Sequence, residues 1–115
     1  MFKKIKWFFQ TLFRGYSDYD MNDYGRFACR KILPSLKHWV YKTEHIGYPE
    51  SVGSLKEWEH ILYEIVWAVE ETAYGRAENE VYNSKHPDYE KVREIWDRAE
   101  KGMELFGKYF TAMWD

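Results

Sequence analysis

Apolar residues recur every three or four positions along most of the chain, which is the spacing of amphipathic α-helices. The third such stretch begins with a capping box, because Ser54 is followed three residues later by Glu57. Clusters of turn-forming residues separate the stretches. The predicted helices span residues 2–14, about 23–42, 54–82, and 88 to near the C-terminus. The pattern therefore predicts an all-α fold, a compact bundle of about four helices that forms a single domain over residues 1–115.

Three residues interrupt the predicted helices. Pro34 lies inside the second helix, and because proline removes a backbone hydrogen bond we expect a kink or a break near residues 30–33. Gly102 and Gly107 lie inside the last helix, where each costs about 1 kcal/mol relative to alanine. We therefore expect another backbone or a ligand to approach closely at these glycines.

Two helices carry apolar faces that a simple bundle does not need. In the third helix, Tyr63, Trp67 and Tyr74 lie opposite the main core stripe, with Glu70 between them. A helix that is apolar on both sides is central in its fold or buried between subunits. Either the helix at 2–14 covers this second face within one chain, or the face forms a subunit interface or an aromatic pocket. The helix at 2–14 is itself basic and amphipathic, and docking on the bundle or on a second copy is favoured over binding to a membrane surface.

The second helix carries a row of basic residues along one face. Arg26, Arg30 and Lys37 follow the spacing i, i+4, i+11, and Tyr41 extends the row. Cations in such a row bind phosphate groups, and arginine does so through two parallel hydrogen bonds. The alternative is that they form ion pairs with the acidic third and fourth helices.

The distribution of charge is uneven, although the net charge is only −2. Residues 1–42 hold nine Lys and Arg against three Asp and Glu, and residues 43–115 hold eight against sixteen. The small net charge argues against a DNA or RNA coat protein. The opposite halves favour packing of basic on acidic elements, within one chain or between copies.

The single cysteine and the N-terminal residues indicate the cellular compartment in which the protein works. The lone Cys29 excludes a disulfide framework, fits a reducing compartment and falls on an apolar helical stripe. No apolar run approaches the roughly 18–20 residues of a membrane span. The basic, aromatic N-terminus lacks a small-residue cleavage site, so we expect residues 1–14 to belong to the mature protein and no membrane partner.

No catalytic or metal-binding constellation is evident. Glu57 and His60 have the Glu-x-x-His spacing of one di-iron half-site, but the chain lacks the second copy that such a site needs. Asp18, Asp20 and Asp23 lack the glycine and the closing glutamate of a calcium-binding loop. We therefore expect no metal, no cofactor and no enzymatic activity.

Several segments together resemble a family of small proteins encoded mainly by tailed bacteriophages. The resemblance covers most of the chain from Gly15 onward, and its specificity comes from the order of the motifs. These motifs are Gly15-Tyr16-Ser17-Asp18 with Asp20, Ile32-Leu33-Pro34 with Leu36-Lys37, Gly47-Tyr48-Pro49, Glu57-Trp58 with Ile61-Leu62, Trp67-Ala68 with Glu70, and Glu104 to Phe110 with Trp114-Asp115. The chain departs from the family pattern at Asn22, Gly25 and Ser35, which bears on ligand specificity.

The family is similar to phage proteins that evade CBASS immunity by sequestering cyclic nucleotide signals. The resemblance implies a non-enzymatic protein of the infected bacterial cytoplasm that binds a cyclic dinucleotide such as 3′3′-cyclic GMP–AMP. The apolar residues on both sides of the third helix lead us to expect a homo-oligomer. The implied roles are phosphate binding by cations, stacking by rings and recognition of base edges by carboxylates. The candidate ligand-binding residues are Tyr16, Asp18, Asp20, Arg26, Arg30, Lys37, Trp67, Glu70 and Tyr109. The alternative hypothesis is an inhibitor or adaptor that binds a host protein through the face of Tyr63, Trp67 and Tyr74.

Overall fold

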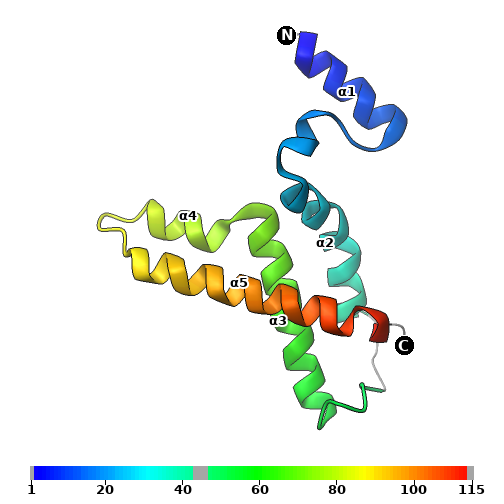
Figure 1. The fold of residues 1–115 in the computed structure, drawn as a ribbon, viewed down its shortest axis with the longest axis vertical. Coiled ribbons are helices and arrows are strands. Elements are labelled where there is room, and N and C mark those ends of the chain that lie inside the picture. The colour runs from blue at the N-terminus through cyan, green and yellow to red at the C-terminus, as the bar shows by residue number, and fades with distance from the viewer. Residues whose placement is uncertain (1, 43–46, 114–115) are drawn as a thin grey trace.

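The computed structural model describes residues 2–42 and 47–113, which form helices joined by short connections (Figure 1). The elements are α1 (Phe2–Arg14), the 3-10 helix η1 (Tyr19–Asp23), α2 (Tyr24–Lys42), α3 (Leu55–Tyr74), α4 (Arg76–Tyr82), α5 (Tyr89–Tyr109) and the 3-10 helix η2 (Phe110–Ala112). No β-strand occurs over these two ranges, so the predicted all-α class is confirmed, with five α-helices in place of about four. The motif residues Trp114 and Asp115 and the start of the predicted turn at Ile46 lie outside the described residues.

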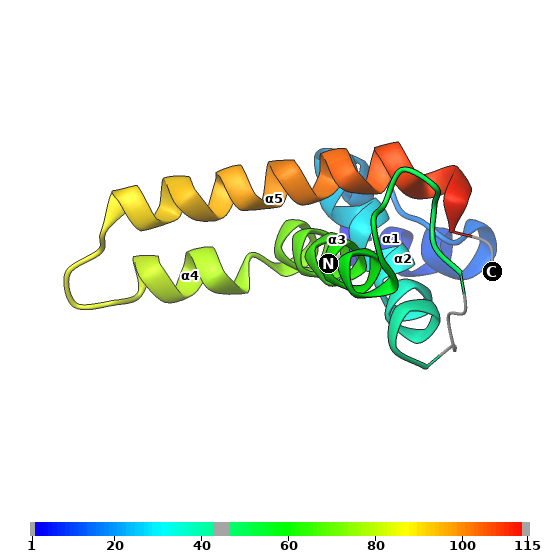
Figure 2. The same cartoon turned by 90° about the horizontal axis from the view of Figure 1, so that it is seen from below.

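Helix α3 is the centre of the fold and packs between α2 and α5. In Figure 2, α5 crosses over α3, and α2 lies beside α3. The apolar spacing along α3 explains this position, because Trp58, Leu62 and Ile65 are almost completely buried. The Trp58 indole meets the Tyr109 ring of α5 edge to face, with 5.4 Å between the ring centroids. Cys29, Leu33 and Leu36 of α2 complete the same core.

A glycine sets the distance between α3 and α5. A Cβ added at Gly102 would overlap the Cβ of Ala68 and lie 2.7 Å from the carbonyl oxygen of Glu64. The predicted close backbone approach is therefore confirmed at Gly102. It is wrong at Gly107, where a Cβ would have no other atom within 4 Å.

An ion pair holds the same crossing. The Arg98 guanidinium donates from Nε and Nη2 to the two carboxylate oxygens of Glu64, over 2.9 and 2.7 Å. These hydrogen bonds lower the pKa of Glu64 below its usual value. The paired geometry fixes α5 against α3 one turn away from Gly102.

The third helix ends at Tyr74, so the prediction that it continues to Tyr82 is wrong. The physical reason is Gly75, whose φ of +62° is a left-handed conformation that terminates α3. The buried Glu71 carboxylate then accepts hydrogen bonds from the backbone N–H groups of Ala77 and Glu78, at 2.8 and 3.1 Å. A side chain near the end of α3 therefore satisfies the free donors at the start of α4.

Replacing Glu71 with alanine is expected to lower the free energy of unfolding by about 1–3 kcal/mol, because two backbone donors lose their acceptor. Glu71→Gln keeps one side-chain oxygen and should lose less. Chemical denaturation of the two variants and the wild type measures the difference. Equal stability of all three proteins would show that the Glu71 carboxylate does not stabilise the α3–α4 corner.

Helix α2 remains a single helix through Pro34. The sequence predicted a kink or a break near this proline, and the break does not occur. Buried residues on both sides of the proline explain this continuity. Cys29 and Leu33 precede Pro34 and Leu36 follows it, and all three are buried in the core. Burial also raises the pKa of the Cys29 thiol, in agreement with its predicted role as a small apolar residue.

Helix α1 contributes no buried residue and stands away from the other helices (Figure 1). Of the alternatives left open for the second face of α3, coverage by α1 within one chain is therefore wrong. The Trp7 ring of α1 contacts the Tyr19 ring of η1, with 4.8 Å between the ring centroids. Within the described residues, no helix is long and apolar enough to cross a membrane.

Candidate functional site

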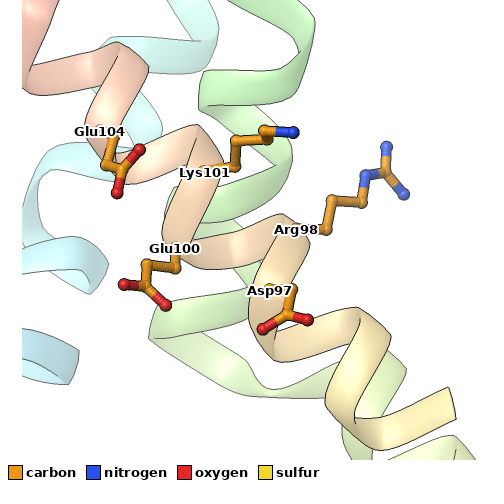
Figure 3. Close-up of a pocket in the computed structure, with 5 residues that line it drawn as sticks. All are labelled: Asp97, Arg98, Glu100, Lys101 and Glu104. Atoms are coloured by element: carbon orange, nitrogen blue, oxygen red, sulfur yellow. The ribbon is translucent and has the colours of Figure 1, made fainter. Parts of the chain in front are cut away.

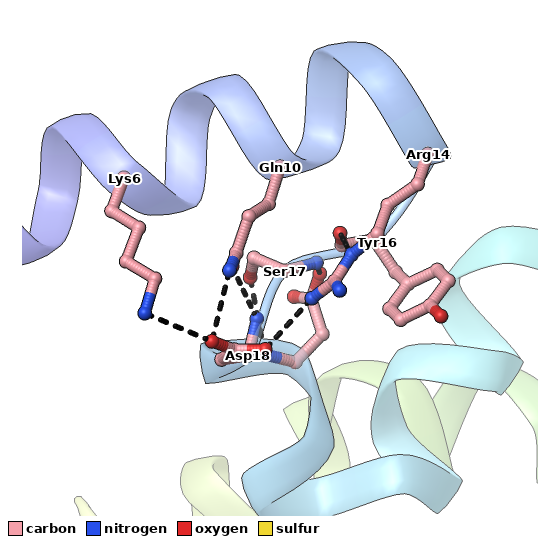
Figure 4. A network of polar contacts seen from close by, with 7 residues as sticks. Lys6, Gln10, Arg14, Tyr16, Ser17 and Asp18 are labelled. Carbon is pink, nitrogen blue, oxygen red and sulfur yellow. Dashed lines mark hydrogen bonds and ion pairs between the residues drawn. The ribbon is translucent and has the colours of Figure 1, made fainter.

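Asp18 organises the segment that joins α1 to η1 (Figure 4). Its carboxylate accepts hydrogen bonds from Gln10 Nε2 at 2.9 Å and from Arg14 Nη2 at 2.7 Å. Lys6 Nζ lies 3.5 Å from the same carboxylate, and the Asp18 backbone N–H donates to Gln10 Oε1. Hydrogen bonds from Gln10 and then Arg14 lower the pKa of Asp18 to about 2. Asp18 therefore anchors α1.

The anchor is expected to weaken only in strong acid. Because the Asp18 pKa is lowered on folding, its stabilising effect is present above about pH 4 and is lost as the pH falls through about 2. A carboxyl ¹³C titration followed by NMR should give a pKa near 2 for Asp18, and Gln10→Ala should move it toward 3.8. An unchanged midpoint in the Gln10 variant would contradict the assigned cause.

The neighbouring candidates Tyr16 and Asp20 also shape this segment. The Ser17 N–H donates to Asp20 Oδ2 at 2.7 Å, and the Asp20 N–H donates to Ser17 Oγ at 3.2 Å. Tyr16 packs edge to face on Phe27, and the Arg14 guanidinium lies 4.4 Å from the centre of the Tyr16 ring. These contacts fix η1 at the start of α2.

A pocket of about 170 Å³ lies where η1 meets α2. It brings together three candidate residues that the sequence predicted, namely Asp20, Arg26 and Arg30. It therefore combines two cations, two aromatic rings and several side chains that accept hydrogen bonds. The complete lining is Tyr19, Asp20, Asn22, Asp23, Arg26, Phe27 and Arg30.

Local contacts position the two arginines one helical turn apart. The Asp23 carboxylate accepts from the backbone N–H of Arg26 at 3.2 Å and lies 3.8 Å from Arg26 Nε. Arg30 Nε donates to the carbonyl oxygen of Ala73 at 2.9 Å, and its guanidinium lies 5.3 Å from the centre of the Tyr74 ring. Asp23 thus caps α2 beside the pocket, and Arg30 joins the pocket to the end of α3.

Lys37 and Glu70 form a separate contact farther along α2. Lys37 Nζ lies 2.8 Å from Glu70 Oε1, and Arg76 Nη1 lies 3.1 Å from the same oxygen. This is the ion pairing between α2 and α3 that was the alternative interpretation of the basic row. Neither Lys37 nor Glu70 lines the η1–α2 pocket.

The two aromatic candidates on α3 and α5 lie apart from the pocket. The Arg98 guanidinium covers the Trp67 ring, with 3.9 Å to the ring centre. Tyr109 is buried against Trp58 in the core. The structure therefore separates both rings from Arg26 and Arg30.

A hollow along α5 differs in character from the η1–α2 pocket. It occupies about 440 Å³ along one side of α5 and contains no aromatic ring (Figure 3). All of its lining residues are charged, namely Asp97, Arg98, Glu100, Lys101 and Glu104. No candidate ligand-binding residue from the sequence lies there.

Sequence reasoning missed several pocket residues. Tyr19, Asn22 and Phe27 line the pocket but belong to no apolar or charged row. The available signal was the spacing, since Tyr19 lies three residues before Asn22 and Asn22 lies four residues before Arg26. Residues three or four apart share one face where the chain is helical. No local pattern connects Trp67 with Arg98.

No group of three or more His, Cys, Asp or Glu side chains that could hold a metal ion occurs in the described part of the chain. Comparisons with known protein families, with curated proteins and with solved structures found no match.

Proposed function

We propose that the protein binds a cyclic nucleotide second messenger of the cyclic GMP–AMP type and sequesters it without cleaving it. Sequestration would block host anti-phage signalling in the cytoplasm of the infected bacterium. The observation that carries the proposal is the pairing of Arg26 and Arg30 in the η1–α2 pocket. The resemblance to phage immune-evasion proteins, described from the sequence motifs, supplies the biological context.

The pocket offers the groups that a nucleotide requires. A guanidinium binds phosphate oxygens through charge-assisted hydrogen bonds. The exposed Tyr19 ring offers a stacking surface, and a base stacked on an aromatic ring contributes about 1–3 kcal/mol. Asp20 and Asn22 supply acceptors, and Asn22 also a donor, for the polar edge of a base.

The size of the pocket limits how much of the ligand it encloses. Small-molecule sites commonly occupy about 300–1,000 Å³. The η1–α2 pocket, at about 170 Å³, matches a phosphate and part of one nucleoside. The proposal therefore assigns this pocket to one half of a cyclic dinucleotide.

Chromatography of a panel of cyclic nucleotides tests the proposal. Each nucleotide is incubated with the protein, and the free pool is measured before and after the protein is heated. Sequestration predicts that one nucleotide leaves the free pool and returns intact on heating. A linear product would indicate an enzyme, and a panel that remains free and intact would refute nucleotide binding.

The second candidate function is binding to a host protein through the outer face of α3. The favouring observation is Tyr63, which is half exposed on that face. Affinity purification from host lysate with wild type and Tyr63→Ala tests it. A stoichiometric host protein retained by the wild type and lost with the variant would support this function over nucleotide binding.

A further inference from the structure

Helix α1 presents an unpartnered apolar face. Phe2, Ile5, Phe9 and Leu12 follow the spacing i, i+3, i+7, i+10 of a helix–helix seam. Phe8 and Phe13 flank that seam. All six side chains are exposed, at fractions from 47% for Ile5 to 86% for Phe2.

The Asp18 anchor determines which side of α1 faces outward. Lys6, Gln10 and Arg14 lie one turn apart on the polar side of α1, and all three contact the Asp18 carboxylate (Figure 4). Because the polar side is held against the chain, the apolar seam points away from it. Within the described residues, no ion pair involves the remaining cations of α1, Lys3 and Lys4.

Helix α5 and the start of η2 carry a second apolar row. Its members recur every seven residues: Tyr89, Trp96 and Met103 of α5 and Phe110 of η2. Tyr89, Trp96 and Phe110 are exposed, whereas Met103 packs against the core. The helical spacing of apolar residues near the C-terminus of the sequence predicts that Trp96 and Phe110 face the core. That expectation is wrong, because both side chains are exposed. Trp96 lies to one side of the α5 face that packs on α3 at Gly102, and Phe110 lies in η2, beyond the end of α5.

Acidic residues flank this row in the middle of α5. Asp97, Glu100 and Glu104 project from one side of the helix, while Arg98 and Lys101 project from another (Figure 3). Arg98 is already paired with Glu64. Over the described ranges, the three acidic residues make no ion pair within the chain, unlike Glu90, which lies 3.7 Å from Arg93.

We propose that α1 of one copy packs along α5 of a second copy, so that the apolar seam of α1 covers the row from Trp96 to Phe110. Lys3 and Lys4 would then lie near the acidic side formed by Asp97, Glu100 and Glu104. The α1 seam fits within this row, since the seam spans about 15 Å and the segment from Trp96 to Phe110 about 21 Å at 1.5 Å per residue. This contact does not depend on nucleotide binding.

The shape of the chain favours a second copy as the occupant. Its radius of gyration is 17.0 Å, whereas a compact chain of this length has about 13 Å. Its extents are 54 × 43 × 21 Å, so it is flat. A lipid surface would cover the α1 seam but would leave the apolar and acidic row of α5 without a partner.

The apolar area is adequate for a specific contact. Each large aromatic side chain buries roughly 150–250 Å² when it is covered completely. Six bulky side chains on α1 that are about half to nine-tenths exposed therefore offer several hundred Å². A standard interface buries about 800 Å² on each partner. Contiguous exposed apolar patches larger than a few hundred Å² mark interaction surfaces.

Complementary charge reversals test the proposal in the full-length protein. The basic variant of α5 is Glu100→Lys with Glu104→Lys, and the acidic variant of α1 is Lys3→Glu with Lys4→Glu. Lysine and glutamate have similar helix propensities, so both variants should fold. The control is Lys56→Glu with Lys85→Glu, which changes the net charge as the acidic variant of α1 does, at exposed lysines outside both rows.

Sedimentation velocity over a range of concentrations measures self-association. We expect each charge-reversed protein alone to associate at least ten-fold more weakly than the wild type. A mixture of the two should regain association, and the control should match the wild type. A monomeric wild type, or variants that associate as strongly as the wild type, would overturn the proposal.

Vesicles containing anionic phosphatidylglycerol provide the second arm of the experiment. Co-sedimentation of a monomeric wild type with these vesicles, lost in the Lys3→Glu and Lys4→Glu variant, would assign α1 to a lipid surface and overturn the proposal. Self-association without vesicle binding, together with recovery in the mixture, would support it.

Discussion

Gly102→Ala is expected to lower the free energy of unfolding by about 1–2 kcal/mol. The added methyl group has no space, because it would overlap Ala68 and crowd the Glu64 carbonyl oxygen. Overpacking of this kind commonly costs about 1–3 kcal/mol and occasionally more, and the gain in helix propensity offsets only about 1 kcal/mol. Urea denaturation followed by far-ultraviolet circular dichroism measures the change.

Gly107→Ala is the matched control for this experiment. It makes the same chemical change in the same helix, at a position where the new methyl group meets no atom within 4 Å. The helix-propensity gain alone should then raise stability by about 0.5–1 kcal/mol. If both variants were stabilised, the close crossing of α5 on α3 would be incorrect.

The double variant Arg26→Ala with Arg30→Ala is expected to weaken binding of the sequestered nucleotide about a hundred-fold or more. Each charge-assisted contact contributes about 1.5–3 kcal/mol, and both arginines line the same pocket. Isothermal titration calorimetry with the nucleotide retained in the chromatography experiment measures the loss. Unchanged affinity would exclude the η1–α2 pocket as the nucleotide site.

Two further variants separate binding from folding and define the extent of the site. Arg30→Lys keeps a positive charge but loses the geometry of the bond to the Ala73 carbonyl, so its melting temperature reports the structural part of the effect. Lys37→Ala is expected to weaken binding by about ten-fold if the site extends along the basic row of α2. Full affinity in Lys37→Ala would confine the site to the pocket.

Local patterns predicted the helices well where capping residues mark their ends. The Ser54 hydroxyl accepts from the Glu57 N–H at 3.1 Å, and the Asp88 carboxylate accepts from the Glu90 N–H at 3.0 Å. The corner at Gly75 was missed because helix-forming residues continue on both sides of it. What ends α3 there is a left-handed glycine together with a Glu71 side chain that reaches Ala77 and Glu78.

The candidate site was predictable only in part, because some of its contacts join residues from separate helices. The row of Arg26 and Arg30 follows from spacing within one helix, and both residues line the pocket. The contact between Lys37 and Glu70 and the one between Trp67 and Arg98 depend on how separate helices cross. Such crossings come from packing between distant segments, which the spacing within each segment does not specify.

The absence of α1 from the core has a consequence for the evolution of the protein. The clustered buried core residues lie between Cys29 and Tyr109, so substitutions on the outer side of α1 leave that core untouched. Selection can therefore alter, exchange or delete this N-terminal helix while the fold beneath it persists. Related chains could thus share the helical core and differ in what they assemble with, through changes confined to about a dozen residues.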